Sequence, residues 1–327
     1  MKALLKLIRW QNLLIIVITM CLMRYAILSS VLGKIGVGLY SLAGRTTAMS
    51  LQMPLIDFIL LVFATILIAA GGYVINDYFD IKTDLINRGK VIVGTKIPRR
   101  QAMMWHNILN VLGVAMGFFI SWRTGYIWMG ILFLLVSGLL YFYSASYKRQ
   151  FLIGNVIVAL LIAMVPMLVV LYEAPYLFSY YAINAVRIPN LGIIFLWVGG
   201  FAVFAFVTTL TREIIKDIED FEGDVAYGRN TIPVIIGILA SKIISVCLIL
   251  VTIVMLGLTW FFLVNDYVTL IYLSVTVVVP LILVIFQVMI SKSRKQLHSA
   301  SRLMKIIMLT GILYSVVVRI LLTYNLV

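Results

Sequence analysis

The sequence has little charge, and negative charge is the scarcest kind. Charged residues make up 12% of the 327 residues, with 12 Asp and Glu against 26 Lys and Arg. An ordinary soluble chain carries about 25% charged residues, so this composition excludes a soluble globular protein. The chain is 63% hydrophobic with a mean hydropathy of +1.12. Its apolar runs of about 20 residues predict an all-α, polytopic membrane protein.

Cysteine and histidine are scarcer still, with two of each. Cys21 and Cys247 lie in apolar segments and predict neither a disulfide framework nor a zinc site. His106 and His298 have no carboxylate at ligand spacing, so no role is assigned to them. The net charge of +14 lies mostly in short loops beside apolar segments. No soluble basic domain is present to carry nucleic-acid binding, which is therefore not expected.

Nine apolar segments are long enough to cross a bilayer, and no soluble domain or long linker separates them. We expect residues 1–327 to form a single domain, a bundle of nine transmembrane helices around a central cavity. The seventh segment is long and is expected to tilt or to begin as an interfacial helix. The segments cover residues 11–32, 55–75, 101–121, 125–147, 152–173, 190–212, 234–263, 267–290 and 305–324.

The distribution of Lys and Arg predicts the orientation. With the N-terminus inside, the inner segments hold 20 Lys and Arg residues and the outer loops hold 4. This excess predicts a multi-pass protein of the cell inner membrane, with a cytoplasmic N-terminus. The basic cluster at 292–305 is interpreted as a topology signal of this kind.

Nine of the 12 acids lie in two runs, after the second and the sixth apolar segments. If each run continues its helix, residues three, four, seven and eight apart share a face. Each run then points a strip of oxygen ligands one way, and both strips lie on the cytoplasmic side. Mg²⁺ prefers such oxygens, together with water and substrate phosphate. The strips are Asn76, Asp80 and Asp84 in the first run, and Asp217, Asp220 and Asp224 in the second.

A diphosphate held by such a site also needs positive partners. Arg88, Lys148 and Arg212 are candidates for phosphate contact, and Lys216 borders the second run. Asn155, near a cytoplasmic helix end, either faces the site or packs between helices. The alternative interpretation of the runs is a scatter of acids on solvated helix ends. Two runs that take most of the acids make that alternative the weaker one.

These residues resemble the motifs of the UbiA superfamily of intramembrane prenyltransferases. The first run reads Asn-Asp-Tyr-Phe-Asp-Ile-Lys-Thr-Asp over 76–84, and the second reads Asp-Ile-Glu-Asp-Phe-Glu-Gly-Asp over 217–224. The resemblance implies that Asn76, Asp80, Asp220 and Asp224 hold Mg²⁺. It implies that the other motif acids, Asp77, Asp84 and Asp217, support the metals or their waters. For a hydroxyl acceptor, either Asp77 or Asp84 is a candidate general base, and the sequence does not decide between them. Tyr143 and Lys148 look like the Tyr and Lys that follow the family's fourth helix.

The resemblance implies Mg²⁺-dependent transfer of a prenyl group from an allylic prenyl diphosphate to an acceptor in the membrane. The form Glu-Asp-Phe-Glu-Gly-Asp over 219–224 looks like the branch that prenylates a glycerophosphate ether-lipid precursor. Aromatic quinone precursors of the hydroxybenzoate, dihydroxynaphthoate or homogentisate type are the alternative acceptors. A membrane transporter or a lipid-binding scaffold is the rival class. Transporters, however, place their polar sites in broken helices near the bilayer midplane.

Overall fold

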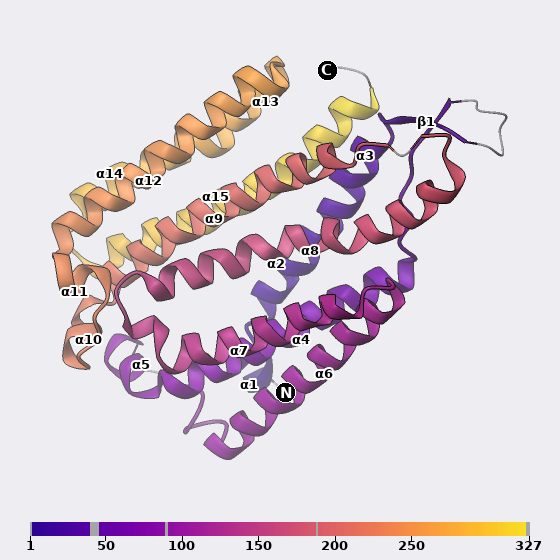
Figure 1. Ribbon diagram of the computed structural model, residues 1–327. Helices are drawn as coiled ribbons and strands as arrows, with labels where there is room; N and C mark the ends of the chain where they lie inside the picture. The colour runs from indigo at the N-terminus through magenta and orange to yellow at the C-terminus, as the bar shows by residue number, and fades with distance from the viewer. Residues whose placement is uncertain (1, 40–45, 89–90, 188, 325–327) are drawn as a thin grey trace.

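The computed structural model describes residues 2–39, 46–88, 91–187 and 189–324, apart from the side chains at 87 and 88. Long helices run side by side across the molecule (Figure 1). The described residues contain nine helices that are long and apolar enough to span a membrane, which confirms the all-α bundle. These spans are α2–η1–α3 (Trp10–Leu32), α4 (Leu55–Phe79), α6 (Arg99–Arg123), η3–α7 (Ile127–Ala145), α8 (Ile153–Asn184), α9 (Gly192–Glu219), α12–η5 (Ile238–Val264), α13–η6–α14 (Tyr267–Ile290) and α15 (Arg294–Thr323).

Short elements connect the spans. A two-stranded antiparallel sheet, which the hydropathy pattern does not predict, lies at the end of the bundle away from α5 and α10 (Figure 1). The π-helical turns within spans are η1 (Met23–Leu28), η5 (Trp260–Val264) and η6 (Ser274–Val278). The remaining elements are α1 (Lys2–Leu7), β1 (Gly36–Gly38), β2 (Thr46–Ala48), α5 (Ile81–Arg88), η4 (Tyr147–Arg149), α10 (Phe221–Ala226) and α11 (Ile232–Ile236).

Three spans differ from their predicted ends for identifiable reasons. Helix α8 continues to Asn184 through Pro166 and Pro175, which neighbouring helices can accommodate inside a bundle. Helix α15 begins at Arg294, eleven residues before the predicted start, behind a capping box at Ser293. The seventh apolar segment begins as the separate helix α11, because Gly237 adopts φ +85° before α12. A separate first helix is compatible with the expectation that this segment begins as an interfacial helix, but the interfacial position itself stays a prediction.

Two acids outside the motifs are fully buried and tie helices together. Asp57 at the start of α4 accepts hydrogen bonds from Arg123 Nε at 2.5 Å and from Tyr176 Oη at 2.7 Å. Glu173 on α8 accepts the backbone N–H of Met53 at 2.9 Å. Charges this deeply buried are tolerated only when they are paired and hydrogen-bonded. These acids therefore stabilise the start of α4, at the opposite end of that helix from the first run.

Six spans enclose a cavity of about 1130 Å³, which confirms the predicted central cavity. Helix α8 packs on α9, and α9 packs in turn on α15 and α12. Helices α12 and α14 lie along one edge of the bundle, outside this ring (Figure 1). The walls come from the α2 span, α4, α7, α8, α9 and α15.

Candidate active site

Both acidic runs bend at their central aspartate. Helix α4 ends one residue before Asp80 and α5 begins one residue after it; Asp220 lies in the same way between α9 and α10. Their backbone angles are φ −90°, ψ 1° and φ −96°, ψ 9°, at the edge of the helical region. The expectation that each run continues its helix without a break is therefore wrong. The turn spacing nevertheless survives, since Asp84 N donates to Asp80 O at 2.8 Å and Asp224 N to Asp220 O at 3.1 Å.

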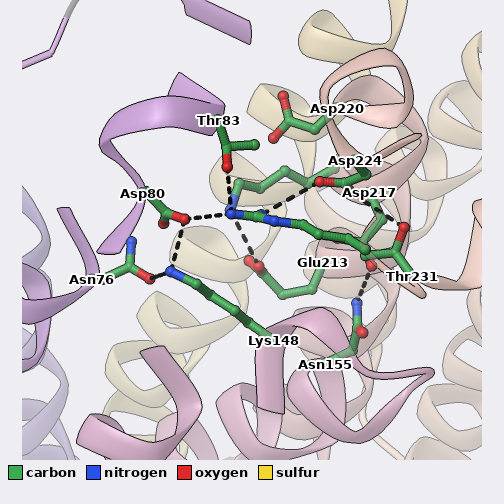
Figure 2. A network of polar contacts seen from close by, with 12 residues as sticks. Asn76, Asp80, Thr83, Lys148, Asn155, Glu213, Asp217, Asp220, Asp224 and Thr231 are labelled. Carbon is green, nitrogen blue, oxygen red and sulfur yellow. Dashed lines mark hydrogen bonds and ion pairs between the residues drawn. The ribbon is translucent and has the colours of Figure 1, made fainter. Parts of the chain in front are cut away.

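The two runs meet across one small polar pocket of about 60 Å³ (Figure 2). The first run approaches from the end of α4 and the second from the end of α9. Despite the bends, both predicted strips reach this pocket, so carboxylates about 140 residues apart in sequence face one another. The pocket is lined by Asn76, Asp80 and Asp84 from the first run, and by Asp217, Asp220 and Asp224 from the second.

Arg229 bridges the two runs. Its Nη2 lies 2.7 Å from Asp80 Oδ1 and 2.7 Å from Thr83 Oγ1, and its Nη1 lies 3.4 Å from Asp224 Oδ1. The side chains of Arg229 and Asp80 are only 12% and 13% exposed. Sequence analysis did not select Arg229, because it lies 149 residues from Asp80 and nothing local distinguishes it from a topology signal.

Lys148 is the second cation beside the first acidic run, which forms one wall of the polar pocket. Its Nζ lies 2.7 Å from Asp80 Oδ1 and 3.4 Å from Asn76 Oδ1, so the predicted phosphate ligand does line the pocket. Burial lowers the pKa of Lys148 to about 8, although Asp80 acts in the opposite direction. Burial would raise the pKa of Asp80, but Lys148 and Arg229 together outweigh it and hold that pKa below its usual value.

The second wall is held by neutral donors as well as by Arg229. Asn155 Nδ2 donates to Asp217 Oδ2 at 2.7 Å, so Asn155 faces the site rather than only packing between helices. Thr231 Oγ1 donates to Asp224 Oδ2 at 3.1 Å. Burial raises the pKa of Asp224 to about 6, against the opposing effect of Arg229. Three carboxylates therefore line this side of the pocket, and carboxylate oxygens favour the entry of a divalent cation.

The donor set suits Mg²⁺ shared with a substrate. Among the described residues, no three Asp, Glu, His or Cys side chains are grouped closely enough to hold a metal by themselves. Amide and carboxylate oxygens instead stand on opposite walls of one pocket. Mg²⁺ usually takes one or two carboxylates and completes its shell with water and substrate phosphate. The residues therefore fit metal ions that are completed by a bound diphosphate.

Replacing Arg229 by glutamine should lower the thermal midpoint of the metal-free protein and enlarge the upward shift that Mg²⁺ gives. Losing one partner of a buried ion pair costs about 3–5 kcal/mol, and it leaves Asp80 and Asp224 without their shared cation. Thermal unfolding with and without Mg²⁺ measures both effects. Arg149→Gln, at an exposed position outside the pocket, is the control. Equal midpoints and equal Mg²⁺ shifts in the two variants would contradict this account.

Among the motif aspartates, Asp77 does not line the polar pocket. Asp77 pairs with Arg9, whose Nη2 lies 2.7 Å from Asp77 Oδ1. Asp77 lines neither the polar pocket nor the large cavity, whereas Asp84 lines the polar pocket. Arg9 just precedes α2, so this ion pair fixes the N-terminal segment against the end of α4.

The other predicted substrate ligands fall into three groups. Tyr143 and Lys216 line both the polar pocket and the large cavity. Arg212 lines only the large cavity, where its Nη1 lies 2.5 Å from Glu213 Oε1. The side chain of Arg88 lies outside the described residues.

The polar pocket opens into the large, mostly apolar cavity. Six residues line both: Arg9, Asn76, Tyr143, Glu213, Lys216 and Asp220. The cavity exceeds the roughly 300–1,000 Å³ of common ligand pockets. The arrangement can therefore hold a long apolar chain with a charged head at the carboxylates.

The start of α15 adds contacts that sequence spacing did not predict. Arg294 Nη2 lies 3.0 Å from Asp220 Oδ1, and His298 Nδ1 lies 2.8 Å from Glu219 Oε1. Reading the 292–305 cluster only as a topology signal is therefore wrong for Arg294. The partners lie more than 70 residues away along the chain, so only a docked α15 brings them together.

Comparison with known proteins agrees with this geometry. The model of the UbiA prenyltransferase family matches residues 37–309. The digeranylgeranylglyceryl phosphate synthase of Methanosphaera stadtmanae is 32% identical over 248 residues, which cover 75% of this chain and 81% of the relative. The synthase of the same name from Thermococcus kodakarensis is 30% identical over 257 residues, or 78% of this chain and 83% of the relative.

Solved structures share the fold. A structure described as digeranylgeranylglyceryl phosphate synthase superposes with a TM-score of 0.62 at 22% identity, covering 96% of this chain and 98% of that one. A UbiA homologue from Archaeoglobus fulgidus, bound to DMAPP and Mg²⁺, gives a TM-score of 0.52 at 15% identity, covering 96% and 98%. With its family model, its relatives and its paired acidic runs in agreement, the chain belongs to the UbiA prenyltransferase family and is a prenyltransferase.

Proposed function

We propose that this protein transfers a prenyl group from an allylic prenyl diphosphate to a glycerophosphate lipid acceptor in the membrane, with Mg²⁺ as cofactor. The observation that carries the proposal is that the polar pocket joins the large cavity. A pocket walled by carboxylates from both runs opens directly into a large apolar cavity, with Asn76, Tyr143 and Asp220 at the boundary. A prenyl diphosphate has the matching form, an anionic head on a long apolar chain.

The residues that would hold Mg²⁺ are Asn76 and Asp80 on one wall and Asp220 and Asp224 on the other. When bound, Mg²⁺ supplies positive charge that stabilises the diphosphate as it leaves. Asp217, which accepts a hydrogen bond from Asn155, would orient water around the metal from the second wall. The A. fulgidus homologue with DMAPP and Mg²⁺ supports this pairing of head group and metal.

Lys148 and Arg229 are the side chains best placed to receive the diphosphate. Lys148 Nζ and Arg229 Nη2 each lie 2.7 Å from Asp80 Oδ1. Cations fixed in advance where negative charge develops stabilise a transition state more than cations that must reorganise. The apolar walls beyond Tyr143 limit the water that would otherwise quench an allylic cation.

The position of the motif acids favours one general base. A hydroxyl acceptor must lose a proton when the new C–O bond forms. Asp84 lines the polar pocket, whereas Asp77 is engaged by Arg9 and lies outside it. We therefore assign the general-base role to Asp84 in preference to Asp77.

The acceptor is proposed from the relatives and from the size of the cavity. Both M. stadtmanae and T. kodakarensis proteins are named digeranylgeranylglyceryl phosphate synthases. Their name implies an acceptor that itself carries a prenyl chain on glycerol phosphate. A cavity of about 1130 Å³ suits two long chains better than one chain with a small aromatic acid.

An acceptor screen tests the proposed function. Purified protein in lipid nanodiscs is incubated with Mg²⁺, prenyl diphosphates of several lengths, and either a prenylglycerol phosphate or an aromatic quinone precursor. Mass spectrometry should show one prenylated glycerophosphate for each diphosphate released. Product only with hydroxybenzoate, dihydroxynaphthoate or homogentisate acceptors would replace the proposed acceptor. Diphosphate binding without product from any acceptor would indicate a lipid-binding scaffold, and substrate flux across vesicles would indicate a transporter.

We also propose that the N-terminus and both acidic runs face the cytoplasm. The positive-charge excess of 20 to 4 supports this orientation. The ion pair of Arg9 with Asp77 puts the N-terminal segment and the first run at the same end of the bundle, so the two share one orientation. In intact cells, a membrane-impermeant thiol reagent should label a cysteine introduced at Lys34 and spare one introduced at Lys292. The reverse pattern would invert the proposed orientation.

A further inference from the structure

The large cavity carries a second group of cations beyond those at the metal pocket. Seven Lys and Arg residues line it, against three acids. The cations come from the N-terminal segment, from α9 and from the first turns of α15, and the acids are Glu213, Glu219 and Asp220. The wall of a mostly apolar cavity therefore has a clear excess of positive charge.

Arg212 and Lys305 are central to this excess. Lys305 lines the same cavity as Arg9, Arg212, Lys216 and the carboxylate of Glu213. Glu213 is shared by Arg212, at 2.5 Å, and Lys216, at 3.5 Å. The N-terminal segment, α9 and α15 thus bring like charges to the same cavity as Glu213.

Such an arrangement calls for an anion. Like charges repel strongly beside a medium of low polarity, and a bound anion converts that repulsion into attraction. The buried Nε of Arg212 has no hydrogen-bond partner among the described residues. Buried donors of this kind are rarely left unsatisfied in a working protein, so this donor indicates a missing acceptor.

The site is separate from the diphosphate pocket. Arg212 and Lys305 line the large cavity and do not line the polar pocket that contains Lys148 and Arg229. The transfer reaction brings two anionic lipids together, one with a diphosphate and one with a single phosphate. One group of cations lies in the polar pocket and the other lines the large cavity, and the two groups correspond to the head groups of the two lipids.

We infer that Arg212 and Lys305 bind the phosphate of the acceptor lipid. This inference rests on the proposed function, because it requires a glycerophosphate acceptor. With its phosphate held there, the acceptor lies on the side of Glu213 and Lys216, two residues shared with the polar pocket. The site would thus select a phosphorylated acceptor over an uncharged prenylglycerol.

The test uses Lys305→Gln in the full-length protein, with Lys305→Arg as the charge-conserving variant. Arg302→Gln is the matched control, since Arg302 is exposed on the same helix, as Lys305 is, but lines neither the cavity nor the polar pocket. Affinity for a prenylglycerol phosphate is measured directly, without diphosphate or Mg²⁺, and beside it the KM of each substrate. Losing one charged contact should weaken acceptor binding and raise the acceptor KM by about 10- to 100-fold. Lys305→Arg should restore most of the affinity.

The KM for prenyl diphosphate and the turnover of an unphosphorylated prenylglycerol should stay within about twofold of the unaltered protein. A rise in the diphosphate KM instead would give these cations to the donor and overturn the inference. Unchanged acceptor affinity in Lys305→Gln would overturn it as well. So would an affinity for inorganic phosphate equal to the affinity for the prenylglycerol phosphate. If the unaltered protein turns over only aromatic acceptors, the proposed function fails first, an outcome distinct from the other three.

Discussion

Replacing Asp80 by asparagine should lower kcat by at least about 10³-fold, the scale of losing a central electrostatic group of an active site. Asp80 is the point where the first wall is organised: Lys148 and Arg229 both lie 2.7 Å from its Oδ1. Asparagine keeps the size of the side chain. It removes the negative charge that holds both cations, and with it a carboxylate ligand for the metal. Asp224→Asn should have a similar effect on the second wall. Steady-state turnover of a prenyl diphosphate with saturating acceptor measures both.

Each variant has a matched control in its own run. Asp77→Asn changes the acid that pairs with Arg9 outside the pocket, and Glu222→Gln changes an exposed acid that lines neither hollow. Both should keep kcat within about tenfold of the unaltered protein, because neither group touches the reacting atoms. If Asp77→Asn is as damaging as Asp80→Asn, Asp77 is the general base after all and its pairing with Arg9 does not persist in the working enzyme.

Removing divalent metal should abolish turnover and weaken diphosphate binding by at least about 100-fold. Without Mg²⁺, a highly charged anion would have to enter a pocket lined by Asp80, Asp217 and Asp224, with Lys148 and Arg229 as its main cations. Repulsion between these charges is strong away from bulk water. Titration of a prenyl diphosphate into protein treated with a chelator, and then with excess Mg²⁺, measures the change.

The chelated protein needs a control for folding. Its thermal midpoint should fall only slightly, because Arg229 and Lys148 hold the walls together when no metal is bound. Added Mg²⁺ should then restore full turnover. Persistent turnover in the chelator would show that these basic residues alone support the leaving group, and the metal assignment would be wrong.

The parts of the site that rest on local pattern could be predicted from sequence. Asn76, Asp80 and Asp84 follow helical spacing, as do Asp217 and Asp224, so each strip was visible without coordinates. That the strips face one another followed from topology, since both fall at helix ends on the same side. Nine apolar runs were long enough that their number did not depend on uncertain boundaries.

Local helix geometry was harder to predict. The bends at Asp80 and Asp220 leave the i to i−4 hydrogen bonds of Asp84 and Asp224 in place, so periodicity gives no sign of them. The early start of α15 was missed because its first turns are basic and fall below any hydropathy threshold. Ser293 and Gln296 did carry a signal, the capping box that marks a helix start.

Long-range pairing could not be predicted from one sequence. Arg229 reaches Asp80, and Arg294 reaches Asp220, across 149 and 74 residues. Each of these cations also satisfies the positive-charge rule, so its local context favours the topological interpretation equally well. Only the folded positions of the α10–α11 connection, which carries Arg229, and of α15 distinguish a ligand from an orientation signal.

The central claim is that carboxylates of both runs hold metal around one diphosphate, and metal location tests it most directly. Crystals or single particles of the protein would be prepared with Mn²⁺ in place of Mg²⁺ and with a non-reactive prenyl diphosphate analogue. The account predicts metal beside Asn76 and Asp80 and beside Asp220 and Asp224, with the diphosphate between them and in contact with Lys148 and Arg229. A diphosphate bound elsewhere would contradict it. Metal bound to only one run, with Arg229 still paired to the carboxylate of the other, would contradict it as well.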